Sequence, residues 1–414
     1  MKIAIVSDDF PPRSFGGAGI IAFSHAKELA RRGHEVIVIT SVQDIKLEGE
    51  RIEDGVYIYN IYVRYNLKWR DYISLYNPQA VQKVKPILEG FKPDVTHIHN
   101  IHVHLSYYTF SLAKRLSKSV FFTAHDSMSV HVGKILPKIT TSSMGQIIFD
   151  YRVSKLETIK HYGLRYNLLR KVFIGYFLNK ANRIFSVSSA LRDALVQNGI
   201  KGVEVMHNGI DAEAFRASME DVSSFKKEYA LENKKILFFG GRISRMKGGD
   251  VAFNLLLELS KLIPDICLLV IGEGGEYMNE LKNKALSANI LDKIRFIQWL
   301  DRDKIPVAYY ASDIMLVPSL YLDPFPTVNL EAMAAGKPVL GTCFGGTSEA
   351  VKDGVTGYIV NPNDKEEVVQ KTRALLEDQN LAEAFGKAGR ELVEKEFSIA
   401  RQVDRLENAY QKNK

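Results

Sequence analysis

The residue types best suited to chemistry gather in the second half of the chain, first of all in a glycine-rich stretch. Phe239-Gly240-Gly241-Arg242 leads to Lys247-Gly248-Gly249, between an apolar strand-like run and a helix-like run. Glycine lets the backbone approach a ligand closely, and a helix start offers unpaired N–H groups and the positive end of a dipole. Arg242 and Lys247 add a planar fork and a compact ammonium that together could hold a diphosphate. An ordinary glycine-rich turn with two solvated cations is equally compatible with the pattern.

Two acidic residues follow another strand-like run and could recognise sugar hydroxyls. Asp323 lies in the proline-rich loop after Ile314–Val317, and Glu331 comes eight residues later, on a helix expected from near Thr327 to Gly336. A carboxylate on the second helical turn can accept two hydrogen bonds from a ribose diol, and one in the loop can reach a sugar. The less specific alternative is a turn acid and a surface helix acid.

The first half opens with a strand, a glycine turn and a helix. Gly16-Gly17-Ala18-Gly19 follows the first strand, and Gly17, Gly19 and Ala22 fit a loose dinucleotide-binding pattern. The second strand ends Ile39-Thr40-Ser41, without the acid that would bind the ribose of NAD, which argues against a dehydrogenase. A plain strand-to-helix turn remains an alternative.

Histidines follow two predicted strands of the first half. His125 comes after Val120–Thr123 and should lie at the carboxyl end of a strand, where parallel sheets bind ligands. Four more histidines, His97, His99, His102 and His104, follow the run that ends at Ile98 or lie close to it. No cysteine and no pair of carboxylates accompanies them, so we expect histidines at a strand end, beside the cleft where an acceptor substrate would bind, and no metal site.

An Asp-x-Asp sequence in the second half could also suggest a divalent ion. Asp301-Arg302-Asp303 directly precedes a helix-like segment. Because aspartate is a favoured helix cap, we expect it to cap that helix and take no metal to be needed.

Strand-like and helix-like segments alternate along both halves. This alternation indicates a parallel, doubly wound sheet in each half, with helices on both faces. Residues 209–234 are polar and a new strand follows them, so we expect an N-terminal domain at 1–208 and a C-terminal domain at 209–396. The final helix, within 397–414, lies beyond the last strand and should pack back on the N-terminal domain.

Composition is that of a globular protein of two domains. The 414 residues are 46% hydrophobic and 25% charged, which excludes a disordered or fibrous chain. No apolar run approaches the roughly 18 residues of a membrane span, and acid follows the first strand too early for a signal peptide. The only cysteines, Cys267 and Cys343, favour buried thiols in a reducing, cytoplasmic compartment over a disulfide scaffold.

The net charge of +7 is unevenly distributed. Residues 1–210 carry 28 Lys+Arg and 17 Asp+Glu, whereas residues 211–414 carry 27 and 31. The most basic stretch, 151–183, mixes eight basic residues and one acid with six aromatic rings. This mixture suits an anionic membrane surface, nucleic acid or anionic glycan, but an ordinary amphipathic helix pair with the aromatic rings in the core is slightly favoured.

Four blocks of the second half resemble, in order and spacing, the nucleotide-sugar-binding half of family 4 glycosyltransferases, the retaining group with the GT-B fold. They are 240–248, Ile271-Gly272-Glu273-Gly274, the acid-x7-Glu segment 323–331, and 345–349 with 353–357. The first half resembles the family more loosely, at 16–19, 33–36, 123–126 and 208–211. The resemblance implies two Rossmann-like α/β domains with doubly wound parallel sheets, facing a central cleft.

The resemblance also implies roles for individual residues. Arg242 and Lys247 would bind the donor diphosphate and Glu331 the ribose, while Asp323, one methylene shorter than the usual Glu, and His125 would face the transferred sugar. The remaining donor contacts would come from Gly17, Gly241, Gly272, Phe325, Pro326, Thr327 and Val328, and the acceptor side from Gly16 and Asp126.

We therefore interpret the chain as an enzyme that moves a sugar from a nucleotide diphosphate donor to a hydroxyl acceptor. A UDP-sugar is favoured and a GDP-sugar comes next; the acceptor would be lipid-linked or a polysaccharide. Family resemblance suggests retention of the anomeric configuration. We expect no cofactor and no nucleic acid partner. We also expect a cytoplasmic protein, which would work at the inner face of the membrane if the basic stretch binds lipid. The alternatives are a non-catalytic nucleotide-sugar-binding protein, a nucleotide-sugar epimerase of the same fold, and an NAD-dependent enzyme.

Overall fold

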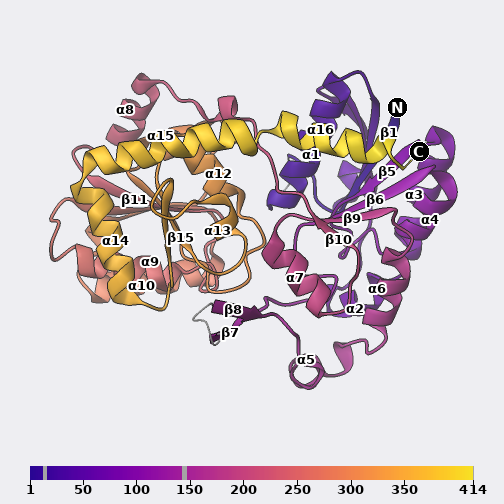
Figure 1. Ribbon diagram of the computed structural model, residues 1–414, viewed down its shortest axis with the longest axis horizontal. Helices are drawn as coiled ribbons and strands as arrows, with labels where there is room; N and C mark the ends of the chain where they lie inside the picture. The colour runs from indigo at the N-terminus through magenta and orange to yellow at the C-terminus, as the bar shows by residue number, and fades with distance from the viewer. Residues whose placement is uncertain (13–15, 142–146, 414) are drawn as a thin grey trace. The chain divides into compact units, whose positions relative to one another are not determined.

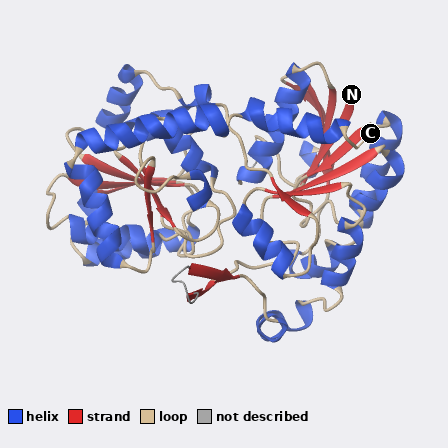
Figure 2. Cartoon of the chain, in the orientation of Figure 1, coloured by secondary structure: helices blue, strands red, loops and turns tan. Residues whose placement is uncertain are grey.

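The chain folds into two compact units, each with a sheet between helices (Figures 1 and 2). The computed structural model describes residues 1–12, 16–141 and 147–413. Unit 1 comprises Met1–Asn208 together with the segment from Ile399, and unit 2 comprises Gly209–Ser398. The predicted fold class, α/β with a parallel sheet in each of two domains, is confirmed.

Unit 1 contains an eight-stranded sheet in the order β10-β9-β6-β5-β1-β2-β4-β3. All neighbouring strands are parallel except β3 and β4, which form an antiparallel edge. The strands are β1 (Lys2–Ser7), β2 (Glu35–Val42), β3 (Gly49–Glu53), β4 (Val56–Tyr62), β5 (Val95–Ile98), β6 (Ser119–Ala124), β9 (Arg183–Ser186) and β10 (Val203–Val205). A separate antiparallel hairpin is formed by β7 (Lys138–Thr141) and β8 (Ile147–Asp150).

Helices cover this sheet because most connections between its parallel strands must cross over one face. The helices of unit 1 are α1 (Gly17–Arg31), α2 (Arg70–Ile73), α3 (Pro78–Phe91), α4 (Thr109–Leu116), α5 (Lys155–Tyr162), α6 (Arg170–Leu178), α7 (Ser189–Gln197) and α16 (Ile399–Gln411). Helix α1 ends where expected, because Gly33 takes the left-handed backbone conformation, φ +83°, that commonly closes a helix.

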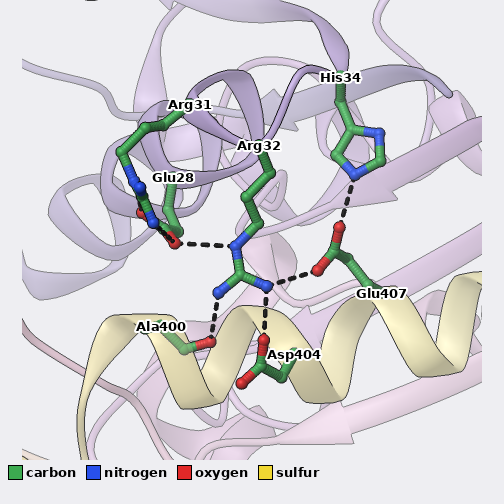
Figure 3. A network of polar contacts seen from close by, with 7 residues as sticks. All are labelled: Glu28, Arg31, Arg32, His34, Ala400, Asp404 and Glu407. Carbon is green, nitrogen blue, oxygen red and sulfur yellow. Dashed lines mark hydrogen bonds and ion pairs between the residues drawn. The ribbon is translucent and has the colours of Figure 1, made fainter.

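Helix α16, the last in the chain, is fixed to α1 by a network of charges (Figure 3). Arg32 Nη1 lies 2.6 Å from Asp404 Oδ1 and 2.5 Å from Glu407 Oε2, and its Nη2 donates to the Ala400 carbonyl at 2.9 Å. The Arg32 Nε donates to Glu28 Oε1 at 2.8 Å. Beneath these charges α16 buries an apolar face in the core of unit 1, made of Val403, Leu406, Ala409 and Tyr410.

Unit 2 contains a six-stranded, entirely parallel sheet in the order β13-β12-β11-β14-β15-β16. The strands are β11 (Lys235–Gly240), β12 (Ile266–Ile271), β13 (Ile294–Ile297), β14 (Ile314–Val317), β15 (Val339–Thr342) and β16 (Gly357–Val360). The helices are α8 (Met219–Glu228), α9 (Gly249–Leu259), α10 (Gly275–Ser287), α11 (Ile305–Ala311), α12 (Thr327–Ala334), α13 (Thr347–Ala350), α14 (Lys365–Glu377) and α15 (Gln379–Glu396).

The inner strands of unit 2 are buried along their length, as expected for strands with helices on both faces. Cys267 lies buried in β12 and Cys343 is half-buried, and both are free thiols. Burial raises the pKa of each thiol, to about 11 for Cys343.

Among the residues that the structure describes, no helix combines the length and the apolar character that crossing a bilayer requires.

Candidate functional site

The strand order of unit 2 has a topological switch point between β11 and β14. From β11 the chain proceeds through β12 to β13 in one direction, and from β14 through β15 to β16 in the other. Doubly wound sheets bind ligands at such a reversal, outside the carboxyl ends of the strands. The loops that leave these two strand ends are residues 241–248 and 318–326, which carry Arg242, Lys247 and Asp323.

At this switch point the structure joins Lys247 to Asp323. The Lys247 Nζ lies 2.7 Å from Asp323 Oδ2, and the same oxygen accepts a hydrogen bond from Ser319 Oγ at 2.7 Å. The Asp323 side chain is 5% exposed, whereas that of Lys247 is 29% exposed. The pair therefore fixes a partly accessible ammonium at the place where the fold favours a ligand.

Two glycines hold the loops around this ammonium. Gly248 has φ +87°, and a Cβ there would lie 2.0 Å from the Pro318 carbonyl oxygen, so only glycine lets the two loops touch. Gly272, after β12, has φ +139°, and a Cβ would lie 1.8 Å from the carbonyl oxygen of Gly241. Both positions belong to the glycine-rich blocks that the sequence singled out, and the close backbone packing explains why they are glycine.

The other two basic side chains of the β11–α9 loop differ in their surroundings. Arg242 is exposed at the beginning of the loop. Arg245 contacts two carboxylates, Asp250 at 3.2 Å and Glu280 at 2.8 Å, and lies over the Tyr277 ring. Arg245 is thus engaged at the surface, whereas Lys247 directly precedes the first turn of α9.

Glu331 lies on α12 and is held by a tyrosine of the preceding helix. Its Oε2 accepts a hydrogen bond from the Tyr309 hydroxyl at 2.8 Å. Burial raises the pKa of Glu331, and the hydrogen bonds from Tyr309 and Thr327 oppose that rise. Burial and the neighbouring carboxylate raise the pKa of Tyr309 well above its usual range, so the phenol stays a donor.

Four consecutive residues predicted to contact the donor, Phe325 to Val328, lie where α12 begins. Phe325 is buried and its ring centroid is 5.8 Å from that of Phe397. Pro326 occupies the N-cap position, and Thr327 and Val328 begin the helix with half-buried side chains. The start of α12 therefore adjoins the loop that carries Asp323, as the motif spacing requires.

Unit 1 has its own switch point, between β1 and β5. The Asp8 carboxylate, at the end of β1, accepts backbone N–H bonds from Val103 at 2.6 Å, His104 at 2.9 Å and Leu105 at 2.7 Å. Gly16 caps α1 and Gly17 begins it, while residues 13–15 of the same loop lie outside the described part of the chain. Sequence reasoning missed Asp8, although an acid directly after a buried strand is a recognisable signal.

Four imidazoles stack inside unit 1 near these strand ends. Ring centroids are 4.5 Å apart for His97 and His99, 5.1 Å for His99 and His125, and 5.4 Å for His25 and His99. His99 Nδ1 lies 2.8 Å from His125 Nε2. Burial lowers the pKa of His25 to about 4 and that of His125 to about 3, and lowers those of His97 and His99 as well. The stack is therefore uncharged at neutral pH.

The prediction that all four histidines from 97 to 104 lie at a strand end was wrong for His97. This residue lies within β5 and is fully buried, with Nδ1 2.5 Å from the Tyr410 hydroxyl and Nε2 2.8 Å from Thr123 Oγ1. Its alternation with His99 places both imidazoles on the same side of the chain, where their ring centroids lie 4.5 Å apart. His97 thus connects β5 to helix α16.

Asp126 follows His125 and organises the next loop. Its Oδ2 accepts a hydrogen bond from Asn100 Nδ2 at 2.9 Å and lies 3.3 Å from His102 Nε2. Its Oδ1 accepts the backbone N–H of Met128 at 2.8 Å. Asp126 therefore ties the β6 end to the β5 end, where the structure also places His125.

The sequence contains two patterns that could suggest a metal site, the histidines from 97 to 104 and Asp301-Arg302-Asp303. Within residues 1–12, 16–141 and 147–413, no three His, Cys, Asp or Glu side chains are grouped as metal ligands. Asp301 occupies the N-cap position of a short 3-10 turn, Arg302–Lys304, but its side chain makes no capping hydrogen bond. The prediction that the Asp301-Arg302-Asp303 sequence caps α11 was wrong, because Lys304 occupies the N-cap position of α11 and no side chain makes a capping hydrogen bond there.

Two sequence families together cover most of the chain. Residues 221–392 match the family described as "Glycosyl transferases group 1", and residues 15–214 match "Glycosyltransferase Family 4". The matches correspond to most of unit 2 and of unit 1.

Curated relatives match over nearly their full length. The chain is 27% identical to spore coat protein SA of Bacillus subtilis, over 100% of both chains. It is 24% identical to N-acetyl-alpha-D-glucosaminyl L-malate synthase of Bacillus anthracis, over 99% of this chain and 97% of the relative.

Solved structures share the fold at lower identity. Sucrose-phosphate synthase from Thermosynechococcus elongatus superposes with a TM-score of 0.77 at 19% identity, over 99% of this chain and 98% of that one. HepE of Anabaena, in complex with UDP and glucose, superposes with a TM-score of 0.73 at 17% identity, over 100% of both chains.

Proposed function

Because the chain belongs to the group 1 glycosyltransferases of family 4, we propose that it transfers a sugar from a nucleotide diphosphate donor to a hydroxyl acceptor. The observation that carries the choice of donor is the Lys247 ammonium, held 2.7 Å from Asp323 at the switch point of unit 2. An ammonium beside a helix start suits a diphosphate, since charge and helix dipole act in the same direction.

The proposed chemistry depends on stabilising the leaving group. As the bond from the anomeric carbon to the diphosphate breaks, negative charge grows on the diphosphate and the sugar becomes oxocarbenium-like. Lys247 and Arg242 would stabilise that charge more in the transition state than in the ground state. Glu331, oriented by Tyr309, would accept hydrogen bonds from the ribose.

Asp323 takes a positioning role in this proposal in addition to its expected contact with the transferred sugar. Its carboxylate holds the Lys247 ammonium through Oδ2. Because the side chain of Asp323 is almost fully buried, its effect on the diphosphate would act through the lysine. His125, neutral at physiological pH because burial lowers its pKa to about 3, would contact the sugar as a hydrogen-bonding group without charge.

We propose that the configuration of the anomeric carbon is retained. The acceptor oxygen would form its bond on the face from which the diphosphate leaves, and the acceptor proton would pass to a leaving phosphate oxygen. This scheme requires neither a metal ion nor another cofactor.

A UDP-sugar is the favoured donor, followed by a GDP-sugar. Support for UDP comes from the structural likeness to HepE, whose complex contains UDP and glucose. The acceptor in this proposal is a lipid-linked or polysaccharide glycan, met at the inner face of a membrane. The basic stretch 151–183 would provide peripheral contact with anionic lipid.

A thermal-shift panel of UDP-, GDP- and ADP-sugars tests the proposal. We expect a UDP-sugar to raise the melting temperature of the full chain, since a ligand that binds only the folded state stabilises it. NAD tests the alternative of an NAD-dependent enzyme and should give no shift. If no nucleotide-sugar stabilises the protein and none is turned over, the proposed donor class is wrong; an epimerised donor, formed without acceptor, would support the epimerase alternative.

A further inference from the structure

Helix α6 is apolar on two opposite sides. On the inner side Ile174, Phe177 and Leu178 are buried in unit 1, where α6 packs against α4. On the outer side five large apolar residues are between 45% and 68% exposed. They are Leu168, Leu169, Val172, Phe173 and Tyr176. Their spacing places them along one face of the helix and the turn before it. Such a contiguous exposed apolar stripe marks an interaction surface.

A second exposed apolar segment is connected to α6 through buried side chains of that helix. Four residues around α2 are exposed by 41% to 55%, namely Leu67, Trp69, Tyr72 and Tyr76. The segment is joined to α6 by the contact of Asp71 with Arg170 at 3.8 Å. A chain of rings makes a second connection, because Tyr76 lies 5.0 Å from Tyr108 and Tyr108 lies 6.2 Å from Phe177.

We call these nine exposed residues of the α2 and α6 segments the α6 face. More than half of the exposed large apolar side chains in the described residues lie within 67–76 and 136–176. The exposed apolar side chains of the described residues are thus concentrated in the parts of unit 1 that contain α2, β7, β8, α5 and α6.

The charges around the α6 face have one sign. Residues 64–76 contain three basic residues and Asp71, and residues 160–180 contain five basic residues and no acid. Asp71 is buried and lies against Arg170, so it adds no negative charge to the surface. Lys68, Arg165 and Lys171 are exposed.

We propose that the α6 face docks on an anionic lipid bilayer. Leu, Val and Phe side chains would enter the apolar boundary, Trp and Tyr would lie at the interface, and the lysines would meet lipid phosphates. A symmetric contact with a second copy would bring the cation-rich face against itself, which is unfavourable. Nucleic acid would use the cations but leave the aliphatic stripe exposed.

This inference rests on and sharpens the membrane contact proposed for residues 151–183. It moves the contact to α6 and adds the α2 segment, which no run of basic residues marks. Lys155, Glu157 and Tyr162 belong to that basic stretch, but their side chains lie outside the described part. The transfer reaction is not a premise of the inference.

Co-sedimentation of the full chain with vesicles tests the apolar part of the α6 face. We expect binding to phosphatidylglycerol–phosphatidylcholine vesicles and none to phosphatidylcholine alone. The double variant Val172→Ser with Phe173→Ser should bind about tenfold more weakly or worse, because two apolar side chains no longer leave water. The matched control, Leu262→Ser with Leu286→Ser, removes exposed apolar residues of unit 2 and should bind like the wild type.

A second pair of variants tests the charges. Lys68→Gln with Lys171→Gln should weaken binding about twenty-fivefold, taking about fivefold for each charge near an anionic surface. Lys227→Gln with Lys365→Gln, two exposed lysines of unit 2, should leave binding unchanged. Added salt should weaken the wild type and affect the Lys68/Lys171 variant less.

Three results would overturn the inference. The first is equal binding to neutral and anionic vesicles, and the second is unchanged vesicle binding by the α6-face variants. The third is a wild-type protein that binds no vesicle but forms a dimer or a DNA complex, which the same variants abolish. Lys247→Ala should bind vesicles like the wild type. Vesicle binding without turnover of any nucleotide-sugar would therefore refute only the proposed reaction, and turnover without vesicle binding only the proposed surface.

Discussion

The strand ends near the two switch points of this protein differ in the basic side chains that they carry. In unit 2 the ends of β11 and β14 carry an ion pair, Lys247 with Asp323. In unit 1 the ends of β5 and β6 carry the imidazoles of His99 and His125, which burial keeps neutral. The same topology thus supports an ion pair in unit 2 and, in unit 1, a cluster of neutral imidazoles near the Asp8 carboxylate that follows β1.

This difference follows from what each strand end must accommodate. A diphosphate needs cations that stay charged, and Lys247 keeps part of its surface in water while a buried carboxylate holds it. A neutral hydrogen-bonding site needs no counter-charge, so its histidines can stack in the core. This burial lowers the stability of the fold in acid, because histidines bind protons in the unfolded chain more readily than in the buried stack.

The largest expected effect breaks the charged site. Lys247→Ala should lower the rate of sugar release from the donor about 10²–10³-fold, or about 2.7–4 kcal/mol, the loss typical of one contact that stabilises a developing anion. It should also destabilise unit 2, because the buried Asp323 loses its ammonium. Steady-state turnover and urea unfolding measure the two effects.

A matched ion pair separates the two roles of Lys247. Lys261 lies 2.7 Å from Glu258 in the same unit, but these side chains are 60% and 50% exposed. Lys261→Ala should change neither turnover nor stability appreciably, since exposed pairs contribute little. Lys247→Ala combined with Asp323→Ala should regain stability and remain inactive; normal turnover in Lys247→Ala would show that the ammonium does not act on the donor.

The next effect concerns the neutral site. Burial lowers the pKa of His25 to about 4 from an ordinary value of 6.5. Between these pH values the unfolded chain binds the proton and the folded chain does not, so stability falls as the pH drops from 6.5 toward 4. The loss from His25 alone is on the order of 3 kcal/mol, to be measured by urea unfolding at pH 7.5 and 4.5.

His25→Leu isolates this contribution. The difference in stability between the two pH values should shrink by the amount that His25 supplies, whatever the substitution does to packing. His207→Leu, which changes a half-buried histidine outside the stack, is the matched control for the substitution itself. An unchanged difference in His25→Leu would mean that the stack does not set the acid sensitivity.

How far the sequence predicts this molecule depends on the range of the interactions involved. The apolar strands and the helix that ends before Gly33 follow from local pattern, and so does the parallel α/β class. The antiparallel edge strand Gly49–Glu53 was missed, because its composition is polar and only pairing with β4 makes it a strand. The β7–β8 hairpin was missed for a similar reason, since it pairs only with itself.

The candidate sites show the same division. Spacing selected Lys247 and Asp323 as separate ligands of a donor, but their direct contact joins loops 76 residues apart and is visible only in the structure. Spacing likewise could not reveal that His97 faces Tyr410 of the last helix. Such contacts depend on strand order, which no local motif contains.

The smallest expected effect tests the support of Glu331. Tyr309→Phe keeps the ring that packs 5.0 Å from Phe238 and removes only the hydroxyl that donates to Glu331 at 2.8 Å. Loss of one such hydrogen bond costs about 0.5–1.5 kcal/mol, so donor affinity should fall about two- to tenfold at neutral pH. The pKa of Glu331, already raised by burial, should rise further, and affinity should then be lost at a higher pH than in the wild type.

Titration calorimetry of the donor across pH 5 to 8 measures both changes. Tyr310→Phe, on the neighbouring position of α11, is the matched control and should leave affinity and its pH dependence unchanged. A fall in affinity for Tyr309→Phe without any shift along the pH axis would mean that the phenol positions α12 and does not tune the carboxylate. Glu331 would then resemble the buried imidazoles of unit 1, where packing rather than charge determines the site.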